Sequence, residues 1–479
     1  MDPIRADVAI IGAGTAGMAA FRAAREHTQS VLLIEGGSYG TTCARVGCMP
    51  SKLLIAAADA AQHVREAEGF GVHAGPPVID GKAVMQRVRS ERDRFVGFVL
   101  ETIDSWPDAQ RTQATARFLD PHTLALDDGR TVQAGRIVIA TGSRTSVPAG
   151  WAEALGDRLV VNDDVFDWQD LPSSVLVVGA GVIGLELGQA LHRLGVRVRM
   201  LAREQRVGGL TDPVVAAHAC TVLQAELPLL LDARIAAVAR EGGQVRVDFR
   251  AGDTDYTERF EFVLAAIGRL PNIEHLNLAA AGIALDARGV PVTDAGTARA
   301  GDSHIFVAGD VATRRLLLHE AADDGRIAGD NAGRFPDVRA QPRRAGLAVV
   351  FSDPQIAVAG RGHAALVAGG APFAVAQLDF ADQGRSRVMR RNRGLLRVYG
   401  EYGTGRFLGA EMIAPAAEHL GHLLAWAVQA GRTVEDMLAS PFYHPVVEEG
   451  VRTALRALER ELHLGPMPAE RGMGPVPGA

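Results

Sequence analysis

Short apolar runs that end in glycine-rich turns divide the chain. The first run, at residues 7–11, leads into Gly12-Ala13-Gly14-Thr15-Ala16-Gly17, and an alanine-rich stretch continues to about His27. A second run, at 30–34, ends at Glu35. Continuous apolar runs of this length are typical of parallel strands buried on both faces. Strand, glycine turn, helix and acid-ended strand together predict a βαβ unit that binds a dinucleotide, with its pyrophosphate at the helix N-terminus.

The same pattern returns later in the chain. An apolar run at 174–178 precedes Gly179-Ala180-Gly181-Val182-Ile183-Gly184, and a second strand is predicted at 196–201. Because each fingerprint holds one dinucleotide, two fingerprints predict two bound dinucleotides.

The end of this second unit differs from the end of the first. Ala202 stands where an NAD site usually places an acid, and Arg203 and Arg206 follow it. An arginine near the adenosine ribose suits the 2′-phosphate of NADP. The pattern therefore slightly favours NADPH over NADH. The alternative is that both arginines are solvated surface residues.

Two cysteines lie close together after the first unit. Cys43 and Cys48 are separated by four residues, and Lys52 follows four residues after the second. In thiol–disulfide exchange one sulfur is attacked by substrate and a second resolves the mixed disulfide, so the pair predicts redox chemistry. Thr42 is a candidate cap for a helix whose N-terminus would lower thiolate pKa values. The alternatives, a stabilising disulfide or a partial metal site, are disfavoured in a chain with three cysteines and no further ligands nearby.

Composition narrows the function classes. The chain has 479 residues, of which 47% are hydrophobic, and its formal net charge is −6. This acidic balance does not support nucleic-acid binding. No apolar run reaches the length of a membrane span, and the first residues enter a strand without a signal sequence, so we expect a cytoplasmic protein with no membrane partner. No metal site is predicted, and Cys220 is expected to be a buried small hydrophobe.

The segments between these motifs predict further elements. Helices are expected at 53–67 and 81–103, and strands at 117–126 and 136–143. Alternating strand signals and then helices follow residue 349, and the tail beyond Leu464 is rich in Pro and Gly and is predicted to be disordered.

The stretch from Gly40 to Lys52 resembles the redox motif GGTCxNxGCxPSK of the pyridine nucleotide–disulfide oxidoreductases. Two positions depart from it, because Thr41 replaces a glycine and Arg45 replaces an asparagine. Other segments resemble further motifs of that family: the ATGS strand at 136–143, the GRxPN turn at 265–272, the strand ending in a flavin-contacting Asp at 305–310, and HPTxxE at 442–449, where Val446 replaces the threonine. Together the motifs cover nearly the entire chain to Leu464.

The resemblance implies an α/β fold with two Rossmann-like dinucleotide-binding domains and a C-terminal α+β dimerisation domain. The expected ranges are an FAD-binding domain at 1–150, an NAD(P)-binding domain at 151–273, a central domain completing the FAD site at 274–345, a dimerisation domain at 346–464 and a disordered tail at 465–479.

The resemblance also implies residue roles. Cys48 would face the flavin and Cys43 would exchange with substrate, while Lys52 and Glu186 would pair near the flavin. His444, oriented by Glu449, would be the acid–base group and would act on the dithiol of the other subunit, which implies a homodimer with shared active sites. The implied cofactor-binding residues are Gly12, Gly14, Gly17, Glu35, Thr42, Lys52, Ala116, Thr141, Gly142, Ser143, Gly179, Gly181, Gly184, Arg203, Arg206, Gly268, Gly309, Asp310, Leu317 and His319.

The activity implied is electron transfer between NAD(P)(H) and a small dithiol or disulfide, through FAD and the Cys43–Cys48 pair. Dihydrolipoamide dehydrogenase is the favoured form, and its substrate would be a lipoyl group, free or on a carrier protein. Gly184, residues 316–319 and the sequence PSK after the second cysteine favour it, whereas Arg45, Val446, Tyr443 and the arginine-ended strand argue against it. The alternatives are an NADPH-driven reductase of another small disulfide, a flavin transhydrogenase or diaphorase, and a structural nucleotide-binding subunit.

Overall fold

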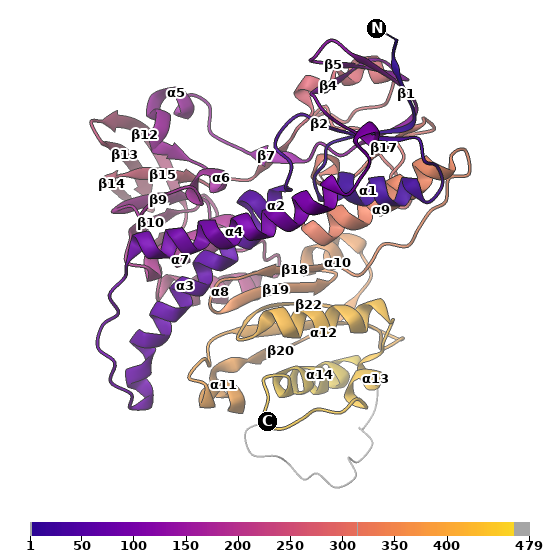
Figure 1. Cartoon of the computed structure of the whole chain (residues 1–479). Helices are drawn as coiled ribbons and strands as arrows, with labels where there is room; N and C mark the ends of the chain where they lie inside the picture. The colour runs from indigo at the N-terminus through magenta and orange to yellow at the C-terminus, as the bar shows by residue number, and fades with distance from the viewer. Residues whose placement is uncertain (1, 314, 464–479) are drawn as a thin grey trace.

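A computed structural model describes residues 2–313 and 315–463. It is a mixed α/β structure in which two nucleotide-binding lobes lie side by side above a third, C-terminal part (Figure 1). The fold class predicted from the sequence is confirmed. The tail at 465–479 lies outside the described residues, and the predicted domain boundaries stay predictions.

The first lobe is built on a seven-stranded sheet in which β1, β2, β6 and β17 run parallel and β4 and β5 add an antiparallel extension. β17 comes from the segment predicted to complete the first nucleotide site, and it pairs with β6. The strands are β1 Ile4–Ile11, β2 Val31–Glu35, β3 Arg111–Gln113, β4 Ala116–Asp120, β5 Thr123–Leu126, β6 Thr131–Ile139 and β17 Ile305–Val307.

Two helices with small residues on their facing sides pack closely in this lobe, namely α1 (Thr15–Arg25) and α9 (Leu318–Arg334). A Cβ added at Gly325 would lie 2.1 Å from the carbonyl oxygen of Ala16, and one at Gly329 would lie 2.2 Å from that of Ala20. Because the α9 glycines let the backbones approach this closely, α9 fixes the start of α1 and with it the first glycine turn.

The second lobe has a five-stranded parallel sheet in the order β11-β10-β9-β15-β8, together with a three-stranded antiparallel sheet. Helices α7 (Val182–Arg193) and α8 (Pro213–Gln224) belong to this lobe, and Cys220 on α8 is buried as predicted. The strands are β8 Leu159–Val160, β9 Ser174–Val178, β10 Arg197–Leu201, β11 Leu229–Leu230, β12 Ala233–Glu241, β13 Gln244–Ala251, β14 Thr254–Phe260 and β15 Phe262–Ala265.

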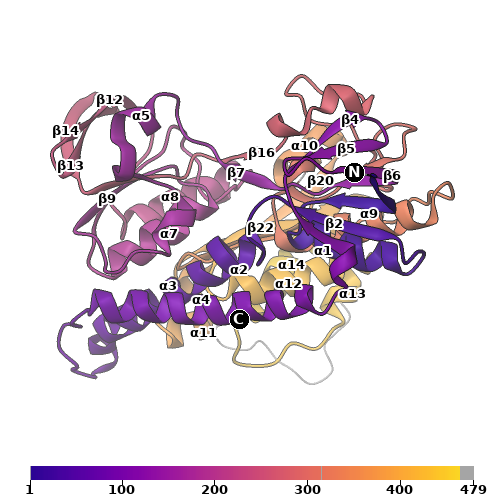
Figure 2. The same ribbon diagram turned by 45° about the horizontal axis from the view of Figure 1, so that its top comes forward.

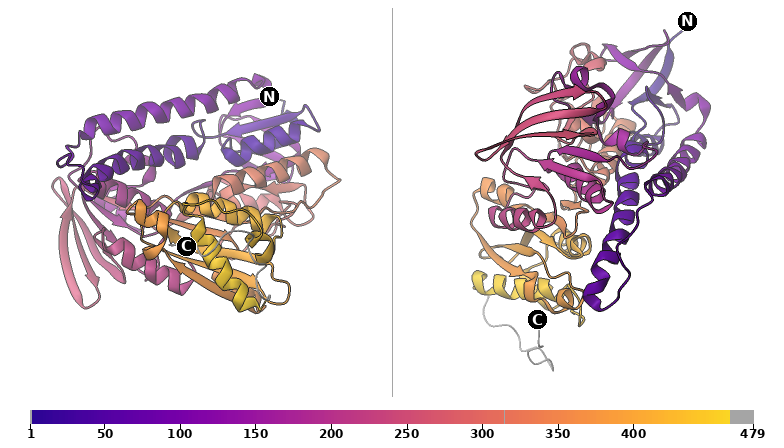
Figure 3. Two further views of the ribbon diagram at one scale, coloured as in Figure 1. Left: turned by 90° about the horizontal axis from the view of Figure 1, so that it is seen from below. Right: turned by 90° about the vertical axis from the view of Figure 1, so that its left-hand side faces the viewer.

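The two lobes are joined by a short antiparallel pair, β7 (Ser143–Thr145) with β16 (Arg269–Pro271), which Figure 2 shows between them. Short helices α5 (Trp151–Leu155) and α6 (Asn162–Val165) follow β7. Two long helices, α3 (Cys48–Glu66) and α4 (Gly81–Asp104), run together along one side of the molecule (Figure 3). α3 begins at Cys48, five residues earlier than the predicted helix, so the second cysteine occupies the first turn of a helix of 19 residues.

The C-terminal part is a five-stranded antiparallel sheet in the order β18-β19-β22-β21-β20, with α12 and α14 packed against it. Its apolar core is continuous across the sheet and both helices. The elements are β18 Leu347–Val350, β19 Gln355–Gly360, α10 His363–Gly369, β20 Phe373–Asp379, α11 Gly384–Val388, β21 Leu395–Glu401, β22 Phe407–Ala414, α12 Ala417–Gln429, α13 Val434–Leu438 and α14 Glu449–Leu462.

Candidate active site between the two nucleotide lobes

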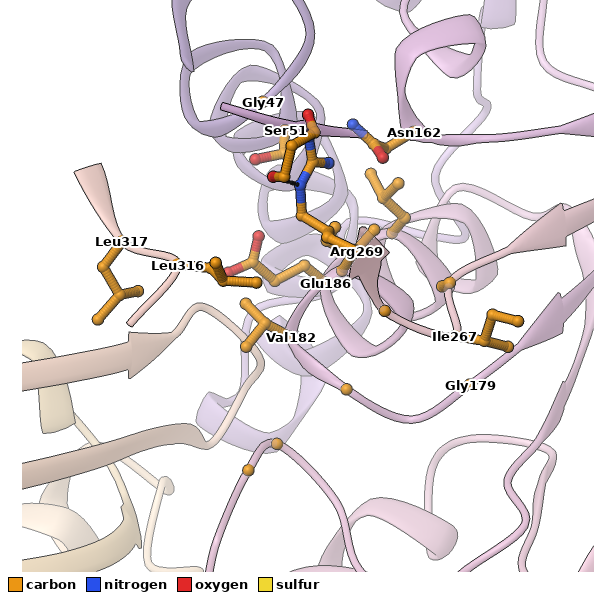
Figure 4. A pocket seen from close by; sticks show the side chains of 18 of the residues that line it. Gly47, Ser51, Asn162, Gly179, Val182, Glu186, Ile267, Arg269, Leu316 and Leu317 are labelled. Carbon is orange, nitrogen blue, oxygen red and sulfur yellow. Dashed lines mark hydrogen bonds between the residues drawn. The ribbon is translucent and has the colours of Figure 1, made fainter. Parts of the chain in front are cut away.

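One large cavity, of about 1370 Å³, lies between the two lobes and reaches the C-terminal part. Figure 4 shows residues of both lobes, and Leu316 and Leu317 from the segment before α9, around it. The cysteine pair, both glycine turns and the end of β10 all contribute to its lining. Its lining includes Gly14, Cys43, Cys48, Lys52, Asn162, Gly181, Glu186, Arg203, Glu204, Arg206, Arg234, Arg269, Asp310 and Phe351.

The two cysteines are placed by a break between helices. The short helix α2 (Thr42–Val46) carries Cys43, Gly47 breaks the helical path, and α3 starts at Cys48. Both sulfurs are free thiols. The pKa of Cys48 is lowered to about 7, chiefly because the Cys43 thiol donates a hydrogen bond to it and secondly because the Lys52 ammonium lies nearby. The same hydrogen bond, together with burial, raises the pKa of Cys43. Above a pH of about 7 the pair therefore holds one proton, on Cys43, and Cys48 is the thiolate.

The prediction that Thr42 caps the redox helix is wrong. Thr42 is the first helical residue of α2, and the cap is Thr41, whose Oγ1 accepts a hydrogen bond from the Ala44 N–H at 3.2 Å. Thr41 takes a φ of 58°, a region that favours the glycine usual at this position in the resemblance. Arg45, the other departure, donates from Nη1 to the Ser38 carbonyl oxygen at 3.2 Å, so its charge is directed to the preceding loop.

Asn162 is a site residue that the sequence did not reveal. Its Nδ2 donates to the carbonyl oxygen of Val46 at 2.8 Å, and its Oδ1 accepts from the Thr145 hydroxyl at 2.8 Å. The side chain is 4% exposed and lines the cavity. Asn162 thus ties the turn between the two cysteines to β7, which joins the lobes. No sequence signal marked it, because the two partners are 116 residues apart.

Lys52 and Glu186 form the ion pair that the family resemblance implied. Lys52 Nζ and Glu186 Oε2 are 2.6 Å apart, and the glutamate side chain is 5% exposed. Lys52 lies one turn after Cys48 on α3, and Glu186 lies on α7 of the second lobe. The pair therefore connects the helix that begins at the redox cysteine to the helix that begins at the second glycine turn.

The first glycine turn has the form of a pyrophosphate cradle. A Cβ at Gly12 would meet the Ala140 carbonyl oxygen at 2.3 Å, whereas a Cβ at Gly14 would meet nothing within 4 Å. Gly14 caps α1 without a side-chain hydrogen bond, so the first N–H groups of α1 are open to an anion at the cavity wall. Glu35 lies at the end of β2, and its Oε2 accepts from the Ala13 N–H at 2.6 Å. These residues fit a dinucleotide.

Other predicted flavin-site residues lie around this turn. Ser143 donates from its hydroxyl to Asp310 Oδ2 at 2.6 Å, and Arg269 Nε donates to the Ser143 hydroxyl oxygen at 2.8 Å. Thr141 Oγ1 instead donates to the Asn272 carbonyl oxygen at 2.7 Å, and so holds the turn that follows β16. Of the remaining predicted residues, Thr42, Gly142, Gly268, Leu317 and His319 line the cavity, while Gly17, Ala116, Gly184 and Gly309 are buried and are not among the described residues that line it.

The second glycine turn repeats the geometry of the first. Gly179 N–H donates to the Leu201 carbonyl oxygen at 2.8 Å, as Gly12 N–H does to Ile34 at 2.7 Å. Strand register pairs Leu201 with Val178 and Ile34 with Ile11, so Ala202 occupies the place that Glu35 holds in the first unit. Gly181 caps α7 without a side-chain hydrogen bond and faces the cavity. The second turn therefore also fits a dinucleotide, and no carboxylate stands at the end of its strand.

Three arginines and one glutamate line this end of the cavity. Ala233 N–H donates to the Ala202 carbonyl oxygen at 2.9 Å, so Arg234 lies beside the end of β10. Arg203 and Arg234 are exposed and line the cavity. Arg206 is paired with Glu204, and both are more than half exposed. The sequence did not single out Arg234, because β12 brings it there from about 30 residues further along the chain.

His444 and Glu449 form a pair at a separate surface. His444 Nδ1 is 3.1 Å from both carboxylate oxygens of Glu449, and the Val446 N–H donates to Glu449 Oε2 at 3.3 Å. The His444 side chain is 53% exposed and that of Glu449 is 5% exposed. Neither residue is among the described residues that line the cavity. Within one chain, the predicted acid–base pair is therefore not brought to the thiols.

The comparison with known families decides the class. Residues 6–325 match the pyridine nucleotide-disulphide oxidoreductase family, and residues 347–455 match the dimerisation domain of that family. The chain belongs to this family. It is therefore an oxidoreductase of a family that depends on FAD and NAD(P), and its dimerisation domain supports a homodimer.

The similarity to known relatives extends over nearly the whole chain. It is 32% identical to the mercuric reductase of Streptomyces lividans, covering 92% of this chain and 93% of that protein. It is 30% identical to the dihydrolipoyl dehydrogenase of Haloferax volcanii, covering 95% and 97%. Among solved structures, LpdA of Mycobacterium tuberculosis has a TM-score of 0.80 at 26% identity, covering 95% of this chain and 99% of that one. These relatives bear names with different substrates, so the likeness establishes the family and not the substrate.

Two further findings concern the described residues only. No helix in residues 2–313 and 315–463 is long and apolar enough to cross a membrane. In the same residues, no group of three or more His, Cys, Asp or Glu side chains is arranged to hold a metal ion. The expectation of a cytoplasmic location stays a prediction.

Proposed function

We propose that this protein transfers two electrons between NAD(P)H and a small dithiol or disulfide, with a dihydrolipoyl group as the leading substrate. One observation carries the proposal. A thiol pair that shares one proton, with a thiolate pKa of about 7, lines the same cavity as the uncapped helix start of the second glycine turn. A nicotinamide site and a redox pair in one cavity suit a flavin disulfide oxidoreductase, and the family and the Haloferax volcanii relative support that class.

FAD, held at the first glycine turn, Ser143 and Asp310, would supply two-electron transfer between the nicotinamide and the disulfide. The chain's own residues do the rest. In disulfide reduction, Cys43, on the short helix α2, attacks the substrate disulfide, and one substrate thiolate leaves. The Cys48 thiolate, which is available because its pKa is low, then attacks the Cys43 sulfur of the mixed disulfide; the second substrate thiolate leaves and the Cys43–Cys48 disulfide forms. The net reaction consumes NAD(P)H, one proton and a disulfide, and yields NAD(P)⁺ and two thiols. It runs in reverse when the dithiol is the better reductant.

The proton is moved by His444 of the other subunit in this proposal. Glu449 accepts the Nδ1 proton of His444, which leaves Nε2 as the accepting nitrogen. Because the His444 side chain is exposed on one chain and the thiols lie elsewhere, His444 reaches substrate across a dimer in this proposal. The dimerisation domain supports that arrangement.

A second candidate, an NADPH-driven reductase of another small disulfide, is favoured by the missing acid at Ala202 and by Arg203 and Arg234 at the end of the cavity. Mercuric ion is a third substrate to test, because the Streptomyces lividans relative bears that name.

The test is steady-state turnover with purified holoenzyme. Lipoamide, dihydrolipoamide, glutathione disulfide and mercuric ion are each assayed with NAD(H) and NADP(H). The proposal predicts the highest kcat/KM for the lipoyl pair and a loss of that activity in Cys43→Ser. The matched control is Cys220→Ser, which removes a buried thiol outside the cavity. Turnover of another disulfide alone selects the second candidate. Turnover that survives in Cys43→Ser would contradict thiol chemistry altogether.

A further inference from the structure

Phe351 contacts both members of the Lys52–Glu186 pair. Its backbone N–H donates to Glu186 Oε1 at 3.0 Å, and the Lys52 ammonium lies 4.5 Å from the centre of its ring. The ring is half-buried and lines the cavity. A cation at this distance over an aromatic face is attracted by the ring quadrupole, and the attraction strengthens as water is excluded. One residue of the C-terminal part therefore binds a glutamate of the second lobe and a lysine of the redox helix.

The position of the ring is fixed by a second attachment to the same helix. Gln189, three residues after Glu186 on α7, donates from Nε2 to the Asp353 carbonyl oxygen at 2.9 Å and accepts from the Asp353 N–H at 2.7 Å. The segment after β18 is thus hydrogen-bonded to α7 at two successive points on one face. Because Phe351 and Asp353 are both hydrogen-bonded to α7, the ring of Phe351 has a defined place over Lys52.

Lys52 has three contacts that fix its ammonium: Glu186 Oε2 at 2.6 Å, the Ser51 hydroxyl oxygen at 3.3 Å and the Phe351 ring. The lysine side chain is still 32% exposed. A flexible, strongly hydrated ammonium with this exposure has alternative positions in water. The ring contact opposes them, because it adds an attraction to the one that the Glu186 carboxylate supplies.

We propose that Phe351 is a positioning residue, which holds the Lys52 ammonium between Glu186 and Cys48 and so couples the nicotinamide side of the cavity to the redox thiol. This inference rests on the proposed function, because it assigns Lys52 a part in both half-reactions. The groups that face the Cys48 sulfur are Cys43 on α2, Lys52 on α3 and Glu186 on α7. Of these, Lys52 is the cation, and it lowers the pKa of Cys48 while Glu186 raises it. Loosening Lys52 should therefore raise the thiol pKa.

Phe351→Leu tests the ring, because the leucine keeps the backbone N–H that binds Glu186. The reporter is an NMR titration of isotope-labelled cysteine in the reduced holoenzyme. The chain has three cysteines, so the resonances are assigned by single substitution. We expect the pKa of Cys48 to rise by more than about 0.3 units in Phe351→Leu and to stay at the wild-type value in Phe351→Tyr, which keeps an aromatic face. We also expect the pre-steady-state rate of flavin reduction by NADPH to fall about two- to fivefold in Phe351→Leu only.

A double-mutant cycle shows whether the effect passes through the lysine. In a Lys52→Met background, Phe351→Leu should change neither the titration nor the reduction rate further. Phe373→Leu is the matched control, because this half-buried phenylalanine of β20 packs against Tyr399 and is not in the cavity. It should leave the Cys48 titration unchanged.

Three results would overturn the inference: an unchanged Cys48 titration in Phe351→Leu, equal shifts in Phe351→Leu and Phe351→Tyr, or the full shift in the Lys52→Met background. The titration needs no disulfide substrate. An enzyme that turns over no dithiol or disulfide but shows the ring-dependent shift would therefore contradict the proposed function, while the placement of Lys52 by the Phe351 ring would stand.

Discussion

Replacing Arg203 or Arg234 by alanine should lower kcat/KM for NADPH and leave kcat/KM for NADH nearly unchanged. Both side chains line the cavity at the end of β10, where Ala202 takes the place that Glu35 holds in the first unit. The hydrogen bond from Ala233 N–H to the Ala202 carbonyl oxygen, at 2.9 Å, brings the start of β12 to this end. An adenosine ribose bound here would meet two arginines, and no carboxylate occupies the position that corresponds to Glu35. These are the groups that a 2′-phosphate requires and a free 2′-hydroxyl does not.

The magnitude follows from the exposure of the two arginines. A hydrogen bond to a charged group is worth about 1.5–3 kcal/mol when it is well shielded. Both guanidinium groups are exposed, so solvent and salt reduce each contribution to about 1 kcal/mol. Each single substitution should then lower kcat/KM for NADPH about fivefold, and the double substitution should lower it about thirtyfold. The value for NADH should stay within about twofold, because NADH carries no 2′-phosphate.

Neutralising Glu204 should have the opposite effect and raise kcat/KM for NADPH. Its carboxylate lines this end of the cavity and holds Arg206 in an ion pair. Glu204→Gln removes a repelling charge and frees that arginine, so kcat/KM for NADPH should rise about two- to fivefold. The pKa of Glu204 is itself lowered by its hydrogen bond with Arg206, so the repelling carboxylate is ionised throughout the neutral range.

The assay is initial-rate oxidation of NADPH and NADH by the same enzyme preparation with one saturating disulfide. Arg197→Ala is the control, because Arg197 lies on the same strand but pairs with Glu258 and does not line the cavity. Equal kcat/KM for the two nucleotides in the wild type would refute the preference. An NADPH value that does not fall in either arginine variant would refute the assignment and leave both as surface residues.

Three further outcomes follow from the same geometry. Thr41→Gly should raise the free energy of unfolding in urea by about 1 kcal/mol. Glycine relieves the strain of the positive φ, and this gain exceeds the small loss from replacing the threonine N-cap by glycine. A clear loss of stability would contradict this. The reduced enzyme should show a long-wavelength absorption band from contact between the Cys48 thiolate and the flavin. This band should reach full intensity above the pKa of Cys48, about 7, and disappear below it. A band that does not change with pH would have to come from another group. His444→Gln should lower disulfide turnover about 10²–10⁴-fold. Mixing this variant with Cys43→Ser should restore activity, because a hybrid dimer has one site with both the histidine and the thiols intact. A mixture that recovers no activity would indicate that each site takes its histidine and its thiols from the same subunit.

The sequence predicted the parts of this site whose causes are local. A glycine turn between an apolar strand and a small-residue helix has the same form wherever it occurs, so both nucleotide turns could be located from Gly12 and Gly179 onwards. The Lys52–Glu186 pair followed from a family likeness. The cap was misplaced by one residue, because Thr41 and Thr42 are adjacent hydroxyls and only the backbone angle shows which one precedes the helix.

The parts that sequence could not predict depend on contacts between distant segments. Asn162 reaches the Val46 carbonyl oxygen across 116 residues, and the Phe351 N–H reaches Glu186 across 165. Neither residue type carries a signature, because an asparagine in a short helix or a phenylalanine after a strand is ordinary in any core. Their roles depend on how β7 and β18 pack against the lobes, and that packing is a property of the whole fold.

The central claim is that electrons from the nicotinamide reach the Cys43–Cys48 pair, and a thiol count tests it directly. The holoenzyme is denatured under anaerobic conditions before and after one equivalent of NADPH, and free thiols are titrated. The chain has three cysteines, and Cys220 lies apart from the pair. We therefore predict one titratable thiol per chain in the oxidised enzyme and three after reduction, with no such increase in Cys48→Ser. A thiol count that stays constant while NADPH is consumed would contradict the account.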